Sequence, residues 1–208
     1  MSEPESTVFV VDDDPSVRKA LERLFKSVGL DVEVFNSAKK FLSCEEHDGP
    51  SCLVLDVRMP GLSGLDLQRE LPAAGKNMPI VFITGHGTVP MSVRAMKAGA
   101  ADFIEKPFED QVLLDAVNKA IERDRSMRLE RAEIAEMEER VESLTPRERD
   151  VFAQVVSGKL NKQIAYALGI SEKTVKVHRA RVMEKMQAKS FADLVRLAEK
   201  VGIEFPKV

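Results

Sequence analysis

The segment "SCLVLDVRMPGLSG" (residues 51–64) decides the fold of the first half of this chain. It begins with an uninterrupted apolar run, residues 52–55, which is typical of a strand that is buried on both faces. The run ends in a carboxylate, Asp56, and a turn rich in proline and glycine follows at once. A single acid at a strand end is usually a cap or a turn residue, so its meaning depends on what the neighbouring strands end in.

Four further segments have the same character and surround this one in the sequence. They are "TVFVVD" (7–12), "DVEVF" (31–35), "PIVFIT" (79–84) and "DFIEKP" (102–107). Each strand pattern is followed by apolar residues at helical spacing, which predicts five βα units. Near-continuous apolar strands that alternate with helices predict an α/β fold, a doubly wound parallel sheet with helices on both faces.

In such a sheet, functional groups collect outside the carboxyl ends of the strands. Here those ends carry three adjacent aspartates at 12–14, then Asp56, Thr84 and Lys106. The clustered carboxylates would repel one another unless a cation neutralised them, and Mg²⁺ (or Mn²⁺) prefers such oxygen ligands. A hydroxyl and an ammonium group suit phosphoryl oxygens, and an aspartate can itself be the nucleophile. The set therefore predicts phosphoryl transfer.

Residues 7–123 resemble the receiver domain of two-component response regulators. The resemblance rests on the acidic pair Asp12-Asp13, the segment "LVLDVRMPGLSG", the "FIT" hydroxyl Thr84 and the pair Lys106-Pro107. It implies the flavodoxin-like strand order 2-1-3-4-5 and a cis peptide bond before Pro107.

The resemblance also implies a role for each residue of the acidic edge. Asp56 would accept a phosphoryl group from a phosphohistidine of a sensor histidine kinase, assisted by Lys106 and Thr84. Thr84 and the aromatic Phe103 would act as the switch that alters the receiver surface. The metal ligands implied are Asp12, Asp13, Asp56 and the backbone carbonyl of Arg58, with Asp12 acting mainly through water.

The charge distribution divides the chain into a front and a back. Residues 1–125 hold 15 Lys and Arg against 21 Asp and Glu, a net charge of −6, and residues 126–144 carry −3. Residues 145–208 hold 13 against 7, a net charge of +6, as expected for a domain with a phosphate-rich partner. We therefore predict a receiver at 1–123, a helical linker at 124–142 and a DNA-binding domain at 143–208. The linker's apolar repeat covers too few heptads to decide whether it forms a dimer.

The basic tail has the pattern of four helices. Thr145 and Glu148 form a predicted capping box, and Asn161 and Ser171 are predicted to cap the next two helices, which a short turn at 168–170 joins. Residues 142–205 resemble the LuxR-type DNA-binding domain in the FixJ-like arrangement behind a receiver. The resemblance is carried by "LTPRE", "NKQIA" and "LGISEKTVKVH".

The helix expected at 172–187 has one face for the core and one for the DNA major groove. Val175, Met183 and Met186 are assigned to the core. Lys and Arg suit guanine edges and phosphates, and an apolar side chain suits a thymine methyl. The resemblance favours Lys176 and Val177 as base readers, with Lys173 close by. The predicted DNA-binding residues are Asn161, Lys162, Lys173, Thr174, Lys176, Val177, His178, Arg179 and Arg181.

The sequence thus predicts a transcription regulator rather than an enzyme. Phosphorylation would favour a homodimer that binds double-stranded promoter DNA and recruits RNA polymerase. Two alternatives remain open, a regulator that works without phosphorylation and a Mg²⁺-dependent aspartyl phosphatase, although the latter favours both acids on one loop. Whether the unphosphorylated state is masked, monomeric or already dimeric is also open, and activation is favoured over repression only by the resemblance.

The remaining features favour a cytoplasmic protein. No apolar run approaches the roughly 20 residues of a membrane span, and the acidic first residues are unlike a signal peptide. Cys44 and Cys52, the two cysteines, have neither a zinc-site spacing nor the number that a disulfide framework needs.

Overall fold

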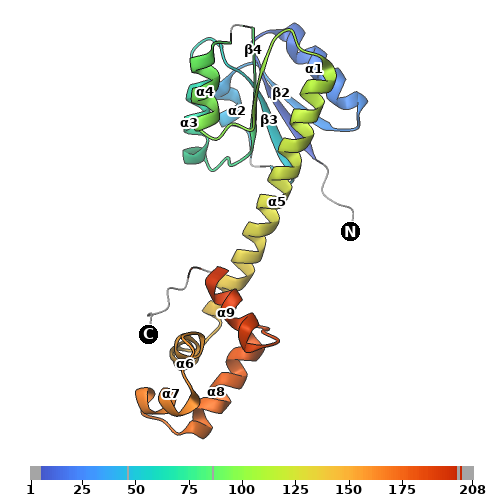
Figure 1. Cartoon of the computed structure of the whole chain (residues 1–208). Coiled ribbons are helices and arrows are strands. Elements are labelled where there is room, and N and C mark those ends of the chain that lie inside the picture. The colour runs from blue at the N-terminus through green and yellow to red at the C-terminus, as the bar shows by residue number, and fades with distance from the viewer. Residues whose placement is uncertain (1–5, 46, 86, 201, 203–208) are drawn as a thin grey trace. The chain divides into compact units, whose positions relative to one another are not determined.

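The computed structural model describes residues 6–45, 47–85, 87–200 and 202 of the 208. The N-terminal stretch in which we expect no signal peptide therefore lies almost entirely outside the described residues. The chain forms two compact units, Met1–Arg128 and Leu129–Val208 (Figure 1). Within the described residues, none of the helices has the length and apolar content that crossing a bilayer requires.

The first unit is built on a parallel sheet of five strands. Its order is β2-β1-β3-β4-β5, which confirms the prediction. Each strand pairs with its neighbours in parallel, and the register places Leu55 opposite both Val11 and Phe82. The strands are β1 (Thr7–Val11), β2 (Asp31–Phe35), β3 (Ser51–Asp56), β4 (Ile80–Thr84) and β5 (Asp102–Glu105).

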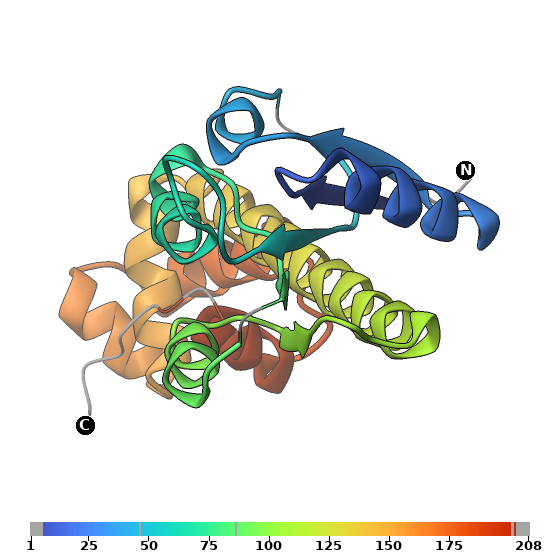
Figure 2. The same cartoon turned by 90° about the horizontal axis from the view of Figure 1, so that it is seen from above.

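Helices cover both faces of this sheet. Figure 2 shows α1 and α5 on one face and α2, α3 and α4 on the other. Successive side chains of a strand point to opposite faces of the sheet. Val8, Val10 and Val54 therefore belong to one core cluster, and Phe9 and Leu53 belong to the other. The helices are α1 (Pro15–Ser27), α2 (Ala38–Leu42), α3 (Gly64–Glu70), the short 3₁₀ helix η1 (Pro72–Ala74), α4 (Val89–Lys97) and α5 (Asp110–Glu142). Because both faces of the central strands are buried, β1, β3 and β4 are almost entirely apolar, whereas the edge strands β2 and β5 also carry exposed acids.

The predicted linker, residues 124–142, is helical and forms part of α5. Asp124, near the middle of α5, is fully buried in the first unit. One of its carboxylate oxygens accepts hydrogen bonds from the backbone N–H of Ser51, at 2.9 Å, and from Nε of Arg128, at 2.8 Å. Arg128 also donates to the carbonyl of His47, at 3.3 Å. These bonds attach α5 to the first residue of β3.

The second unit packs α6 (Pro146–Val156), α7 (Asn161–Leu168), α8 (Glu172–Lys185) and α9 (Phe191–Lys200) around one apolar core. The predicted core residues Val175 and Met186 are fully buried, and Met183 is partly buried against them. Gly169 ends α7 with a left-handed φ of 64°, a conformation that glycine adopts without steric cost. The turn between α7 and α8 therefore has the predicted helix-turn-helix form.

The predicted helix caps at Thr145 and Ser171 are confirmed. Thr145 accepts from the N–H of Glu148, whose carboxylate accepts in turn from the N–H of Thr145, and Ser171 accepts from the N–H of Thr174. The prediction that Asn161 caps α7 is wrong. Asn161 is already the first helical residue, and the preceding N–H, of Leu160, donates to the side chain of Gln163 instead.

Candidate functional site

The parallel sheet brings the predicted polar residues to one edge. Asp12 directly follows β1, Asp56 and Thr84 end β3 and β4, and Lys106 directly follows β5. Because neighbouring parallel strands end side by side, residues that are far apart in the sequence meet here. Asp12 and Lys106, for example, are 94 positions apart. Asp12, Asp56 and Thr84 are all buried, at 1%, 6% and 1% exposure.

Lys106 is the centre of this cluster. Its Nζ lies 2.8 Å from Oδ2 of Asp12 and 3.0 Å from Oδ1 of Asp56, so one ammonium group bridges the two buried carboxylates. Burial raises the pKa of Asp56, with a further contribution from the charge of Asp12, and Lys106 opposes both effects. Burial by itself would lower the pKa of Lys106, but the two carboxylates outweigh it and raise that pKa. The lysine thus already neutralises part of the charge that we expected a metal ion to neutralise.

Backbone groups fix the orientation of both acids. The N–H of Arg58 donates to Oδ2 of Asp56 at 2.7 Å, and the N–H of Asp14 donates to Oδ1 of Asp12 at 2.8 Å. The guanidinium of Arg18 donates to the carbonyl of Asp12 at 2.6 Å. Asp56 is therefore held with its oxygens toward Lys106 and toward its own loop, at the end of a rigid strand.

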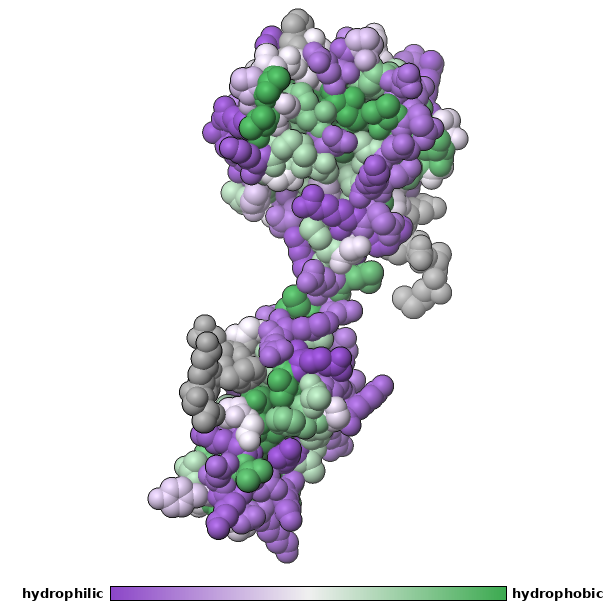
Figure 3. All heavy atoms as spheres, viewed as in Figure 1, coloured by the Kyte–Doolittle hydropathy of each residue, from purple (hydrophilic) through white to green (hydrophobic). Residues whose placement is uncertain are grey.

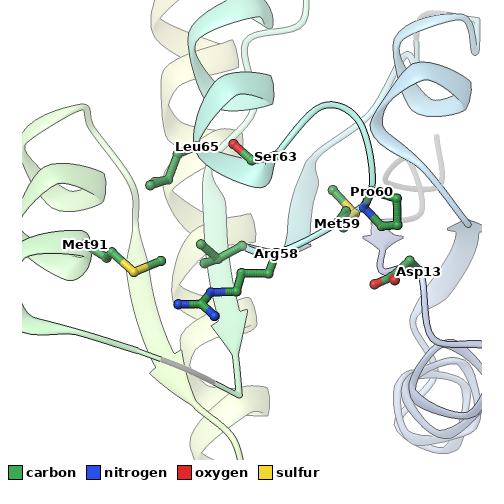
Figure 4. A pocket seen from close by; sticks show the side chains of 8 residues that line it. Asp13, Arg58, Met59, Pro60, Ser63, Leu65 and Met91 are labelled. Carbon is green, nitrogen blue, oxygen red and sulfur yellow. The ribbon is translucent and has the colours of Figure 1, made fainter.

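Asp13 and Arg58 differ from these residues because they are exposed. Both line a pocket of about 500 Å³ beside the acidic edge, together with residues of the loop after β3 and Met91 of α4 (Figure 4). Figure 4 shows the Arg58 side chain extending toward α4 and the Asp13 carboxylate on the other side of the pocket. The edge is therefore open to a small molecule or an ion.

The donor set fits a hard divalent cation in type. Asp12, Asp13, Asp56 and the carbonyl of Arg58 offer only oxygen, the ligand atom that Mg²⁺ prefers, and Mg²⁺ keeps several waters in such sites. Among the described residues, no group of three or more Asp, Glu, His or Cys side chains could hold a metal ion by itself. A metal ion at this edge would consequently depend on carbonyl, water and phosphoryl oxygens as well as on carboxylates.

Thr84 and Phe103 lie on neighbouring strands at the same edge. The carbonyl of Thr84 accepts from the N–H of Lys106 at 2.7 Å, and the Lys106-Pro107 bond is cis, as predicted. Phe103 is half-buried, with its ring centroid 6.1 Å from that of Phe82. A side chain at Gly87 would touch both Phe103 and Thr84, so this glycine leaves room between the two.

The second candidate site is the outer face of α8. Lys173, Lys176, Val177 and Arg181 are exposed on it, whereas Val175 and Val182 are buried on the opposite face. Val177 is 47% exposed and shares this face with the three cationic side chains. This face therefore presents cations around one apolar contact point, which suits the edges of base pairs.

Of the other predicted DNA-binding residues, all except Lys162 are partly buried. Arg179 is half-buried, donates to the side chain of Asn161 at 3.3 Å and lies 5.7 Å from the ring centroid of Phe191. His178 and Thr174 are half-buried as well, and Nδ1 of His178 is buried without a hydrogen-bond partner. Lys162, on α7, is exposed.

Two positioning residues of the acidic edge were missed from the sequence. Arg18 lies one helical turn beyond the N-cap residue Asp14 and reaches back to Asp12, and nothing in the sequence distinguishes it from the other basic residues of α1. The sequence places Gly64 in a turn, but the structure shows that a β-carbon there would fall well inside contact distance of the Asp56 carbonyl oxygen and 3.1 Å from Cα of Val57. The run "PGLSG" was the only signal for it.

Two family models match this chain. The response regulator receiver domain matches residues 8–118, and the family described as bacterial regulatory proteins, luxR family, matches residues 142–198. Together they cover both of the charge-defined parts of the sequence.

Several proteins are similar over nearly the whole length. Nodulation protein W of Bradyrhizobium diazoefficiens is 54% identical over 199 residues, 96% of this chain and 88% of the relative. The transcriptional regulatory protein FixJ of Rhizobium meliloti is 47% identical and covers 92% of this chain and 94% of its own. The structure of the response regulator StyR is 50% identical with a TM-score of 0.85, covering 95% of this chain and all of the other. Full-length FixJ of B. japonicum is 43% identical with a TM-score of 0.57, covering 95% and 98%.

Proposed function

The chain belongs to the two-component response regulators that carry a receiver domain and a LuxR-type DNA-binding domain, and from this premise we propose that Asp56 is its phosphoacceptor. The observation that carries the proposal is the placement of Asp56 at the end of β3, bonded to Lys106 and to the N–H of Arg58. One carboxylate oxygen would attack the phosphorus of a phosphohistidine on a sensor histidine kinase. Lys106 and the Thr84 hydroxyl would then hold the transferred phosphoryl oxygens.

A Mg²⁺ or Mn²⁺ ion would be held by Asp13, Asp56 and the carbonyl of Arg58, with Asp12 acting through water. When bound, it supplies positive charge for the phosphoryl oxygens. The exposed carboxylate of Asp13 supports this assignment, since it lies beside the open pocket. Before the ion and the phosphoryl group bind, the Lys106 ammonium group reduces the electrostatic repulsion between the carboxylates of Asp12 and Asp56.

Phosphorylation would shift the receiver toward a state that forms a homodimer. Thr84 would move toward the phosphoryl group, and Phe103 would follow into the space that Gly87 leaves. Apolar side chains gather on the face of the first unit that carries α4 and α5 (Figure 3), and Val89, Val93 and Met96 of α4 are exposed on it. We assign the dimer contact to this surface.

The second unit would bind double-stranded promoter DNA through α8. Lys173, Lys176 and Val177 would read bases, and Lys162, Thr174, Arg181 and the pair Asn161–Arg179 would contact the backbone, with His178 at its side. Two copies on paired half-sites would supply the affinity that a single small domain lacks. The paired units would help to recruit RNA polymerase, as an activator. A kinase partner and a DNA partner would both place the chain in the cytoplasm.

The decisive experiment measures phosphoryl uptake. The full-length chain is incubated with Mg²⁺ and acetyl phosphate, and the mass of the intact protein is followed over time. We expect the wild type to gain one phosphoryl group, Asp56→Asn to gain none, and Asp115→Asn, which changes an exposed acid of α5, to behave as the wild type. Equal uptake by Asp56→Asn would refute the assignment.

The two alternatives are separated by the same samples. Continuous release of phosphate at a rate far above the decay of one aspartyl phosphate would identify a phosphatase. Promoter binding that is equally strong in wild type and Asp56→Asn, with and without acetyl phosphate, would identify a regulator that works without phosphorylation.

A further inference from the structure

Lys76 and Cys44 form a second close pair of reactive groups, remote from the acidic edge. Nζ of Lys76 lies 3.4 Å from Sγ of Cys44. Lys76 belongs to the loop that precedes β4, and Cys44 to the loop that precedes β3. Both loops therefore lie at the amino ends of the strands, the edge opposite Asp56.

The Lys76 ammonium group is buried in an unusual environment. The residue is only 8% exposed. Its Nζ donates to the carbonyls of Cys44, at 3.0 Å, and Glu45, at 3.4 Å, and lies 5.5 Å from the ring centroid of Phe41. Buried lysines are ordinarily paired with a carboxylate, but in the described part of the chain the contacts of this ammonium are two carbonyls, a ring and the sulfur. These contacts hold the amine against the thiol.

The second cysteine has the opposite environment. Cys52 is fully buried in β3, and burial, together with the charge of Asp124, raises the pKa of its thiol far above the usual range. Cys44 is partly exposed and beside a cation, the type of environment in which cysteines react with oxidants. Since the chain has only these two cysteines, Cys52 is an internal control for the reactivity of Cys44.

We propose that Cys44 and Lys76 form a covalent cross-link in response to peroxide. Peroxide first oxidises the Cys44 thiol to a sulfenic acid: an S–O bond forms, the O–O bond breaks and one water leaves. The Lys76 amine, after releasing its proton to solvent, attacks the sulfur, so that an S–N bond forms, the S–O bond breaks and a second water leaves. The net change is the loss of two hydrogen atoms from the protein, with sulfur oxidised and peroxide reduced. An excess of small thiol reverses the reaction by attacking the sulfur.

The test maps peptides of the full-length chain after treatment with hydrogen peroxide. Cleavage after glutamate separates Cys44 from Cys52, because Glu45 and Glu46 lie between them. We expect the Cys44 and Lys76 peptides to appear joined, lighter than their sum by two hydrogen atoms, and trypsin to stop cleaving after Lys76. Dithiothreitol should restore both peptides, and Cys52 should remain a thiol throughout.

The matched variant is Lys76→Arg, which keeps the positive charge and the hydrogen-bond donors but removes the primary amine. In it we expect dimedone to trap Cys44 as the sulfenic acid, with no joined peptide. The proposal is overturned if the wild type keeps a free Cys44 thiol or forms only dead-end sulfur acids. It is also overturned if Lys76→Arg shows the same loss of two hydrogen atoms. The wild-type peptide map decides the matter even if the variant does not fold.

Discussion

Gly64 determines how closely the start of α3 can approach the strand that carries Asp56. Its N–H donates to the carbonyl of Val57 at 3.0 Å, and a β-carbon at this position would overlap the carbonyl oxygen of Asp56. The atom in the way is backbone, so it cannot turn aside as a flexible side chain would. A methyl group here must move either α3 or the acid itself.

We expect Gly64→Ala to destabilise the first unit by about 1–3 kcal/mol, the usual cost of overpacking, and to slow phosphoryl uptake at Asp56. Thermal unfolding and the intact-mass assay measure the two effects. Gly85→Ala is the control for stability, because a β-carbon there meets nothing within 4 Å. Unchanged stability and uptake in Gly64→Ala would show that the close contact does not matter.

At this scale the sequence predicted which side chains meet but not how they are bonded. Asp12, Asp56, Thr84 and Lys106 could be placed at one edge because each ends or directly follows a predicted parallel strand. The bridge from Lys106 to both acids could not be predicted, because it depends on the path of a flexible four-carbon side chain between neighbouring strands. The Cys44–Lys76 contact was missed for the same reason.

The start of α6 shows a second scale, that of the single element. Glu148 completes the capping box with Thr145 and also accepts from Nζ of Lys185, at the end of α8, at 2.7 Å. The lysine hydrogen bond, followed by the bonds to Thr145, lowers the pKa of Glu148 from 4.5 to about 2. One carboxylate thus joins the first turn of α6 to the last turn of α8.

A lowered pKa in the folded state means that the carboxylate stabilises the fold when it is ionised. This stabilisation is complete above about pH 4.5 and is lost as the pH falls toward about 2. We therefore expect that the free energy of unfolding of the second unit decreases less steeply with falling pH in Glu148→Gln than in the wild type. Hydrogen exchange of the α6 amides measures this free energy at each pH. Glu199→Gln, at an exposed acid of α9, should leave the curve unchanged. A slope as steep in Glu148→Gln as in the wild type would contradict this account, because the lowered pKa of Asp193 accounts for only a smaller slope that both proteins share.

Helix α8 gives the prediction for DNA binding. Lys176→Ala should weaken binding to sites selected from a randomised duplex pool by about 1–3 kcal/mol and relax the preference at one base pair. Lys189→Ala, at an exposed lysine beyond α8, should change neither. Fluorescence anisotropy at a fixed salt concentration measures both quantities. A uniform loss across all sequences would instead make Lys176 a phosphate contact.

The helix limits themselves were largely predictable, since proline, serine and threonine at helix starts have a local physical reason. The cap of α7 was not. Asn161 suits an N-cap, but as the first helical residue it accepts a hydrogen bond from Arg179 of α8 instead. The hydrogen bond between α7 and α8 thus replaces the expected cap. The sequence of α7 alone cannot predict it, because it depends on how the two helices pack.

At the scale of the whole molecule, phosphorylation should change the mass of the particle in solution. We expect light scattering to show the wild type doubling in mass with acetyl phosphate and Mg²⁺. Val93→Asp, on the exposed face of α4, should take up phosphate yet remain a monomer. Val28→Asp, at an exposed valine beside the end of α1, should dimerise as the wild type does. Dimerisation of Val93→Asp would place the contact elsewhere.

The bond from Asp124 to Ser51 has a practical consequence for anyone who recombines such modules. A receiver fragment that ends at residue 123, the boundary predicted from the sequence, lacks Asp124. The buried N–H of Ser51 then has no acceptor, which lowers the free energy of unfolding by about 1–3 kcal/mol. Excision after Arg128 retains the carboxylate and its guanidinium, and comparing the melting temperatures of the two fragments reveals the difference. A chimera joined at residue 123 would therefore contain a destabilised receiver. Its loss of signalling would resemble that of a chimera whose DNA-binding domain is incompatible with the receiver.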